Sequence, residues 1–261
     1  MMTWSRRPNP QSGLRSILLA SFVVAGSLTG CSGDADDARV VSVFAAASLT
    51  NAFTVLEVAF EDAHPDLDLQ FNFAGSSTLR EQILEGAPVD VFAAANESIM
   101  QQLVESGDVQ GPPVVFASNR LMIAVPVDNP GDVDELGDLD RDELLIGLCA
   151  AGVPCGDLAR EVLDQAGVVV VSDTDEPDVR ALLAKIAAGE LDAGLVYASD
   201  VAAFETQVVG IDLPNGLLVE SRYPIARMSA SLNPAGADTF VEFVQSAKAV
   251  EVLADAGFQR P

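Results

Sequence analysis

The chain has 261 residues, 49% of them hydrophobic, and 39 acidic residues against 14 Lys and Arg give it a formal net charge of −25. So much negative charge repels nucleic acid, and we therefore exclude nucleic acid as a partner. The low aromatic content (6%) suits a tightly packed protein of the α/β class.

The first thirty residues are predicted to be a lipoprotein signal peptide. Three arginines accompany the apolar run SILLASFVVAGSL, which is too short to span a bilayer as a helix. The run ends in LTGC, which resembles the lipobox of bacterial lipoproteins and implies that Cys31 is lipidated. The alternative is an ordinary secretory signal with a chance cysteine. Removing residues 1–30 takes away three arginines and no acid, so the formal charge falls from −25 to −28, and residues 31–39 form a tether.

From residue 40 onward, short apolar runs alternate with amphipathic helical patterns, which is typical of a parallel sheet with helices on its faces. Each of the first three runs leads directly into a helical pattern, and the segment that begins at RYPIA adds a further strand and two helices. The predicted strands of the alternation are VVSVF (40–44), LDLQFNF (67–73), VDVFAAA (89–95), LLIGLCA (144–150), VVVVSD (168–173) and LDAGLVYA (191–198).

Two such series of strands predict two lobes. Between them lies RLMIAVPV, which is followed by a stretch rich in Pro, Gly and Asp where we expect the chain to cross between lobes. We assign residues 40–125 and 224–261 to lobe I and residues 126–223 to lobe II, each with a mainly parallel sheet flanked by helices. Ligands of such sheets bind beyond the carboxyl ends of the strands, so the organisation predicts a hinged binding protein with its ligand between the lobes.

Three junctions between a strand and a helix have the composition of anion sites. They contain Ser48 in FAAASLT, Ser76 in FAGSSTL and Cys155 in GVPCGDLARE. Helix N-termini leave backbone N–H groups unpaired and carry about half a positive charge, so amides and hydroxyls can hold an oxyanion there without a basic residue. Ordinary N-capping is the alternative at each junction, because serine is a common N-cap residue.

Two cysteines remain once Cys31 is assigned to the lipid. Cys149 and Cys155 have five residues between them, and in an exported protein we expect such a pair to form a disulfide. Two free thiols are the alternative. A zinc site would need more ligands, and the single histidine is far away in the sequence.

Three segments, VFAAASLT, FAGSSTLREQILEGAPVDVFAAAN and LDAGLVYASD, resemble in order and spacing the hallmark segments of the periplasmic molybdate-binding proteins, the solute receptors of molybdate ABC importers. The resemblance covers residues 40–258. It implies the two-lobed periplasmic-binding-protein fold and a receptor without enzymatic activity. It also implies molybdate, and usually tungstate, as the ligand, with no cofactor and no direct bond from the protein to molybdenum.

The same resemblance implies the ligand donors, residue by residue. Ser48 and Ser76 would each donate a hydroxyl, and Tyr197 in VYASD would donate its phenol O–H from the hinge side. Backbone N–H groups would come from Cys155, where the family often has alanine, and from Val179 in PDVRALL.

The expected function is to capture molybdate outside the cytoplasm, as a monomer tethered to the membrane by lipid, and to deliver it to a permease driven by a cytoplasmic ATPase. A receptor of the same fold for sulfate, thiosulfate or another tetrahedral oxyanion is the alternative, and a sensor would use the same binding chemistry. A serine hydrolase is disfavoured, because His64 would be its only possible base and the sequence has no GxSxG motif.

Overall fold

The structure is a computed structural model and describes residues 39–214, 216, 217 and 219–261. The predicted signal peptide, Cys31 and all of the predicted tether except residue 39 lie outside the described residues. Within those residues, no helix is both long enough and apolar enough to span a membrane.

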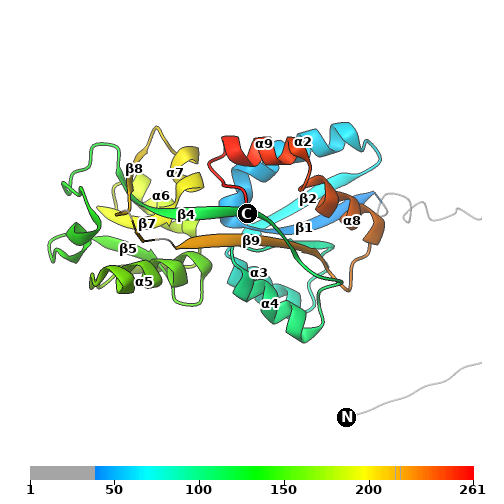
Figure 1. The fold of residues 1–261 in the computed structure, drawn as a ribbon, viewed down its shortest axis with the longest axis horizontal. Coiled ribbons are helices and arrows are strands. Elements are labelled where there is room, and N and C mark those ends of the chain that lie inside the picture. The colour runs from blue at the N-terminus through cyan, green and yellow to red at the C-terminus, as the bar shows by residue number, and fades with distance from the viewer. Residues whose placement is uncertain (1–38, 215, 218) are drawn as a thin grey trace, which may run out of the picture. The chain divides into compact units, whose positions relative to one another are not determined.

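Three parallel strands form one part of the sheet, with β1 paired to both of its neighbours. β1 has the sequence VVSVFAA and is mostly buried, because helices cover both faces of these strands (Figure 1). The strands are β1 (Val40–Ala46), β2 (Asp68–Ala74) and β3 (Val91–Ala93). The helices that follow them are α2 (Thr50–Ala63), which the short 3-10 helix η1 (Ala47–Leu49) precedes, α3 (Ser76–Leu84) and α4 (Glu97–Ser106).

A second group of parallel strands repeats this pattern, with β5 paired to both β6 and β7. Its strands are β5 (Ile146–Cys149), β6 (Thr174–Glu176) and β7 (Ala193–Tyr197), and they are followed by α5 (Pro154–Ala166), α6 (Val179–Ala187) and α7 (Ala198–Ala203). A further strand, β8 (Val208–Asp212), runs antiparallel to a strand that enters from the first group.

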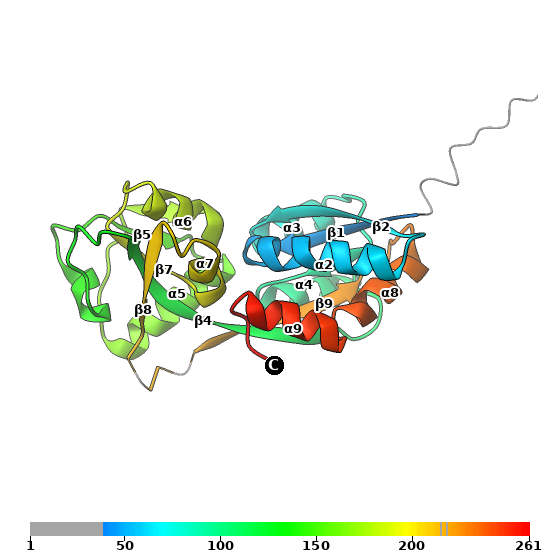
Figure 2. The ribbon, with the colours of Figure 1, turned by 90° about the horizontal axis from the view of Figure 1, so that it is seen from above.

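Two strands, β4 (Val114–Pro126) and β9 (Glu220–Arg227), connect the two groups (Figures 1 and 2). They pair antiparallel with each other, beginning with Val114 opposite Ile225. β9 also pairs with β3, and the second half of β4 pairs with β7 and β8. The chain therefore passes from one group to the other along β4 and returns along β9.

Each group has its own hydrophobic core, so we call the part that contains β1–β3 lobe I and the part that contains β5–β8 lobe II. The core of lobe I includes side chains of α8 (Pro234–Phe243) and α9 (Ala247–Asp255). Phe240 of α8 meets Phe53 and Phe60 of α2 edge-on, with ring centroids 5.9 and 5.4 Å apart. These contacts fasten the C-terminal helices to lobe I. The predicted lobe boundaries, 125/126 and 223/224, fall within β4 and β9 and stay a prediction.

The predicted two-lobed α/β fold is confirmed, but the strands pair into one continuous nine-stranded sheet, in which antiparallel β4 and β9 join the parallel strands of the two lobes. One predicted strand is wrong. The predicted strand 168–173 does not form, and β6 begins only at Thr174. Val168 and Val170 pack against the lobe II core, whereas Val169 and Val171 are exposed. The run of four valines therefore covers the core with one side only. The sequence also does not predict β8, whose residues are mostly part-exposed and precede no helix.

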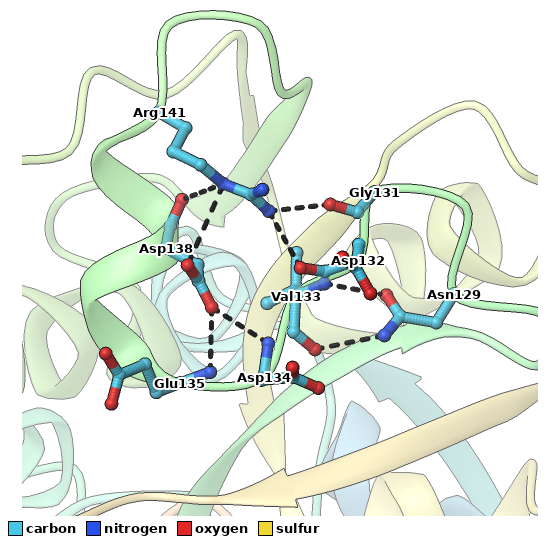
Figure 3. Close-up of polar contacts among 8 residues, drawn as sticks. All are labelled: Asn129, Gly131, Asp132, Val133, Asp134, Glu135, Asp138 and Arg141. Atoms are coloured by element: carbon cyan, nitrogen blue, oxygen red, sulfur yellow. Dashed lines mark hydrogen bonds and ion pairs between the residues drawn. The ribbon is translucent and has the colours of Figure 1, made fainter.

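The stretch rich in Pro, Gly and Asp that follows β4 folds back on lobe II (Figure 3). The Asn129 side chain bonds both the carbonyl oxygen and the N–H of Val133, at 3.0 and 3.1 Å. Arg141 donates to two backbone carbonyl oxygens at the start of the stretch. In η2 (Leu136–Asp140), Asp138 accepts two backbone N–H groups, which lower the pKa of its carboxyl. Because Val133 is fully buried in the lobe II core, the stretch is an ordered part of that lobe.

Candidate functional site

A small pocket lies between the lobes, at the carboxyl ends of strands from both lobes. Its cavity volume is about 10 Å³. Lobe I contributes the end of β1, the starts of η1 and α3, and Ala95, which follows β3. Lobe II contributes the starts of α5 and α6 and the end of β7. The lining residues are Ala46, Ala47, Ser48, Gly75, Ser76, Ala95, Val153, Pro154, Cys155, Asp178, Val179 and Tyr197.

All five residues that the sequence analysis proposed as ligand donors line this one pocket. They come from five separate segments of the chain, which the fold brings together because successive parallel strands end at the same edge of their sheet. None of the lining residues, all of which belong to the described part of the chain, is Lys, Arg or His. An anion in this pocket would be held by neutral hydrogen-bond donors.

Ser48 lies in η1 and is buried, but it does not cap a helix. Its hydroxyl lies 2.9 Å from the hydroxyl of Tyr223 on β9, and either oxygen can be the donor. Burial raises the pKa of Tyr223 well above its usual value, so Tyr223 keeps its proton. If Tyr223 donates to Ser48, the Ser48 proton is free to point to a ligand in the pocket.

Ser76 is the first residue of α3, and Gly75 occupies the N-cap position. The Ser76 hydroxyl oxygen accepts the N–H of Ala95 at 2.9 Å. Its proton then remains to be donated, and among the described residues no acceptor lies within hydrogen-bond distance. The N-capping alternative fails for both serines, since each hydroxyl bonds a group from another element.

Backbone amides at the helix starts add further donors. The N-cap residues of η1, α3 and α5 are Ala46, Gly75 and Val153, whose side chains have no atom that can accept a hydrogen bond. α5 then begins with Pro154, which has no N–H, so the Cys155 amide is the first donor of that helix. The positive ends of these helix dipoles lie at the pocket and favour an anion there.

α6 differs, because it has a side-chain cap. Asp178 accepts the N–H groups of Arg180 and Ala181, both at 2.9 Å. The amide of Val179 is not among the donors to Asp178, so it is left for a ligand in the pocket. The sequence analysis predicted the Val179 amide as a ligand donor, and in the first turn of α6 this amide precedes the two that the Asp178 side chain binds.

Tyr197 brings the most unusual group to the pocket. Its side chain is 1% exposed, and among the described residues its hydroxyl has no hydrogen-bond partner of normal geometry. Burial raises the pKa of this hydroxyl far above its usual value, more than the nearby Ser221 and Tyr223 hydroxyls lower it. A buried protonated hydroxyl without an acceptor costs free energy, which an anion in the pocket would recover.

Cys149 and Cys155 form a disulfide between the end of β5 and the start of α5. Both residues are buried. The bond closes the loop that presents the Cys155 amide, and Gly156 lies so close to this loop that an added Cβ would be 2.1 Å from the Ala150 carbonyl oxygen. The loop is therefore held by covalent and steric constraints together.

Behind the pocket, Asp200 of α7 is fully buried and forms an ion pair with Arg180, with the Arg180 Nε 2.8 Å from a carboxylate oxygen. Burial raises the pKa of Asp200 to about 7, and Arg180 opposes this rise without cancelling it. Arg180 is thus engaged with Asp200 and does not serve the pocket as a free cation.

Sequence reasoning missed Tyr223, and it predicted a close backbone turn at Gly75 but not the contact of Gly75 with the other lobe. Tyr223 positions Ser48, and its ring lies 6.0 Å from that of Tyr197, so the only two tyrosines of the chain meet beside the pocket. Gly75 lets lobe II approach closely, since an added Cβ would lie 2.4 Å from the Pro177 carbonyl oxygen. The scarcity of tyrosine was the one available signal for Tyr223. His64 is not a lining residue of the pocket; its ring packs on Phe60, with ring centroids 4.7 Å apart.

Comparison with known proteins gives consistent results. The sequence model described as bacterial extracellular solute-binding protein matches residues 41–259. The molybdate-binding protein ModA of Mycobacterium tuberculosis is 36% identical over 249 residues, which cover 94% of this chain and 95% of that protein. The periplasmic molybdate-binding protein of Azotobacter vinelandii has a similar structure, with a TM-score of 0.75 at 20% identity over 85% of this chain and 99% of that one. The sulfate-binding protein SubI of M. tuberculosis has a TM-score of 0.74 at 17% identity, over 85% and 87% of the two chains. At 20% and 17% identity, the similarity to these last two proteins shows only a shared fold.

Proposed function

Since the chain belongs to the bacterial extracellular solute-binding protein family, we propose that it captures molybdate, and tungstate with it, outside the cytoplasm and delivers it to a membrane permease. The family consists of receptors and not of enzymes. The pocket between the lobes supports this function, because it combines the Ser48, Ser76 and Tyr197 hydroxyls with the amides of Cys155 and Val179. The proposed ligand is held as an intact oxyanion, so no protein atom bonds molybdenum and no cofactor takes part.

The observation that carries the proposal is the buried Tyr197 hydroxyl, which stays protonated and lacks an acceptor. A donor of this kind needs an acceptor oxygen, and fully ionised molybdate, tungstate and sulfate each supply four oxygens that carry no proton and can only accept. The similarity to the molybdate-binding protein ModA, at 36% identity, supports molybdate as the ligand. Sulfate or thiosulfate is the alternative ligand, because the sulfate-binding protein SubI has the same fold.

The remaining parts of the proposal concern the cellular setting. A solute receptor works with a permease whose cytoplasmic ATPase drives import, and we propose that this chain does so as a monomer. Lipid on Cys31 would hold it at the outer face of the cell membrane once residues 1–30 are removed. Its formal charge of −28 after that removal opposes anion approach, so the pocket donors must offset a general repulsion.

The direct test is calorimetric titration of the protein without residues 1–31 with molybdate, tungstate, sulfate and phosphate at one ionic strength. We expect one-to-one binding of molybdate and tungstate and no heat from sulfate or phosphate. Binding of sulfate without molybdate would leave the fold assignment intact and replace the proposed ligand.

Tyr197→Phe should separate ligand binding from stability. The change removes one donor to the oxyanion, so we expect molybdate affinity to fall about tenfold, which corresponds to about 1.4 kcal/mol. The ligand-free protein should be as stable as the wild type or more stable by about 1 kcal/mol, because an unpaired buried hydroxyl is lost. Thermal unfolding with and without molybdate measures both effects.

The matched control for this change is Tyr223→Phe, because it removes the same atom from the neighbouring ring. That hydroxyl bonds Ser48, so its loss should lower the stability of the ligand-free protein. Equal molybdate affinity in Tyr197→Phe and the wild type would show that the phenol does not touch the ligand.

A further inference from the structure

We propose that Arg180 and Asn51 form a latch that holds the two lobes closed over the ligand, with Arg180 acting as a positioning residue. The Arg180 guanidinium on α6 of lobe II donates to the Asn51 side-chain oxygen on α2 of lobe I, at 2.9 Å. The latch rests on the proposed function, since its purpose is to slow the release of the captured oxyanion.

Arg180 is held in place by its own lobe before it reaches the other. Its Nε lies 2.8 Å from the buried Asp200 carboxylate, and the centre of its guanidinium lies 5.3 Å from the centre of the Phe204 ring. An arginine fixed on two sides loses little further conformational freedom when it makes one more hydrogen bond. The contact with Asn51 therefore costs little ordering and acts mainly on the separation of the lobes.

Both ends of the latch lie next to groups that line the pocket. Arg180 directly follows Val179, whose amide faces the proposed ligand, and Asn51 lies three residues after Ser48. The latch therefore joins the starts of α6 and α2 at the level of the pocket. Closing it brings the donors of the two lobes within reach of one anion.

A second contact between the lobes lies just before the start of α6. Gly75 at the start of α3 meets Pro177, two residues before Val179. The start of α6 is thus held against lobe I at two points, by packing at Gly75 and by a charged hydrogen bond at Asn51. The Asn51 contact is the one of the two that can be removed without disturbing the backbone, because Asn51 is exposed.

Asn51→Ala removes the lobe I half of the latch and leaves Arg180 paired with Asp200. The contact is partly solvated, so we expect molybdate to dissociate about fivefold faster and the dissociation constant to rise by a similar factor. The melting temperature of the ligand-free protein should stay at the wild-type value. Thr54→Ala is the matched control: Thr54 is also exposed on α2, and its hydroxyl bonds only the Thr50 carbonyl within its own helix. It should leave release unchanged.

The experiment combines stopped-flow release of molybdate with the distance between two spin labels, placed at Val58→Cys in lobe I and Val169→Cys in lobe II, where the native side chains are 62% and 70% exposed. Faster release and a smaller population at short distance in Asn51→Ala would support the latch. Release and distances equal to those of the wild type would overturn it. A wild type that binds no molybdate would overturn the proposed function instead, and the distances without ligand would then decide on the latch alone.

Discussion

Gly75→Ala should lower the affinity for molybdate about 100-fold while leaving the ligand-free protein as stable as the wild type. The new methyl carbon would lie 2.4 Å from the Pro177 carbonyl oxygen of the opposite lobe, and ordinary contact begins near 3.4 Å. The lobes must then stay about 1 Å further apart. Hydrogen bonds weaken steeply beyond about 3.2 Å, so donors from both lobes can no longer reach one anion together. Loss of about two such bonds to a charged ligand corresponds to the expected 100-fold.

The backbone gives no other reason for a glycine at this position. Its φ of −57° is one that any residue adopts, so the substitution affects only the approach of the two lobes. Gly137→Ala is the matched control, since its added Cβ would meet no atom closer than 3.9 Å. Titration calorimetry and ligand-free thermal unfolding of both variants test the prediction. If Gly75→Ala binds molybdate as tightly as the wild type, close packing of Pro177 on Gly75 is not needed for binding.

The sequence was informative about the fold wherever an apolar run led straight into an amphipathic helix. VVSVF and LDLQFNF became β1 and β2 with small changes at their ends. β1 is mostly buried between two parallel strands, and β2 is an edge strand whose phenylalanines are half-buried. The run VVVVSD misled, since its composition is typical of a buried strand while its place beside the sheet leaves Val169 and Val171 exposed. Composition reports how easily a segment forms a strand, and the pairing partner is decided elsewhere in the chain.

In the site, too, the sequence predicts local patterns but not contacts between distant segments. Ser48 and Ser76 could be found because a serine at a strand-to-helix junction is a local pattern. Their actual partners, Tyr223 and the Ala95 amide, lie on other elements and are fixed only when the sheet forms. Contacts between the lobes, such as that of Arg180 with Asn51, join residues 129 positions apart and leave no trace in either segment.

Asp200→Asn should change how stability depends on pH. In the folded protein, burial raises the pKa of Asp200 to about 7 from an ordinary value of 3.8. Between these two values the folded state holds the proton and the unfolded chain does not. The stabilisation from this proton is therefore complete below about pH 4 and is lost as the pH rises through about 7. Asparagine cannot ionise, so the variant does not lose this stabilisation. The unfolding free energy of the variant minus that of the wild type should therefore be about 3 kcal/mol greater at about pH 8 than at about pH 5.

Urea unfolding of both proteins across that pH range measures the difference. In the variant Arg180 meets an amide, where below about pH 7 the wild type offers it a protonated carboxyl. This difference shifts the whole curve without changing its slope, so the slope carries the prediction. Asp212→Asn is the matched control, because Asp212 is also paired with an arginine, Arg120 at 2.7 Å, but is 72% exposed. Its curve shows what the loss of an arginine-paired carboxylate does at the surface, where no charge is buried. A curve for Asp200→Asn that runs parallel to that of the wild type would mean that Asp200 is ionised throughout the range, with the Arg180 ion pair strong enough to outweigh the cost of burying its charge.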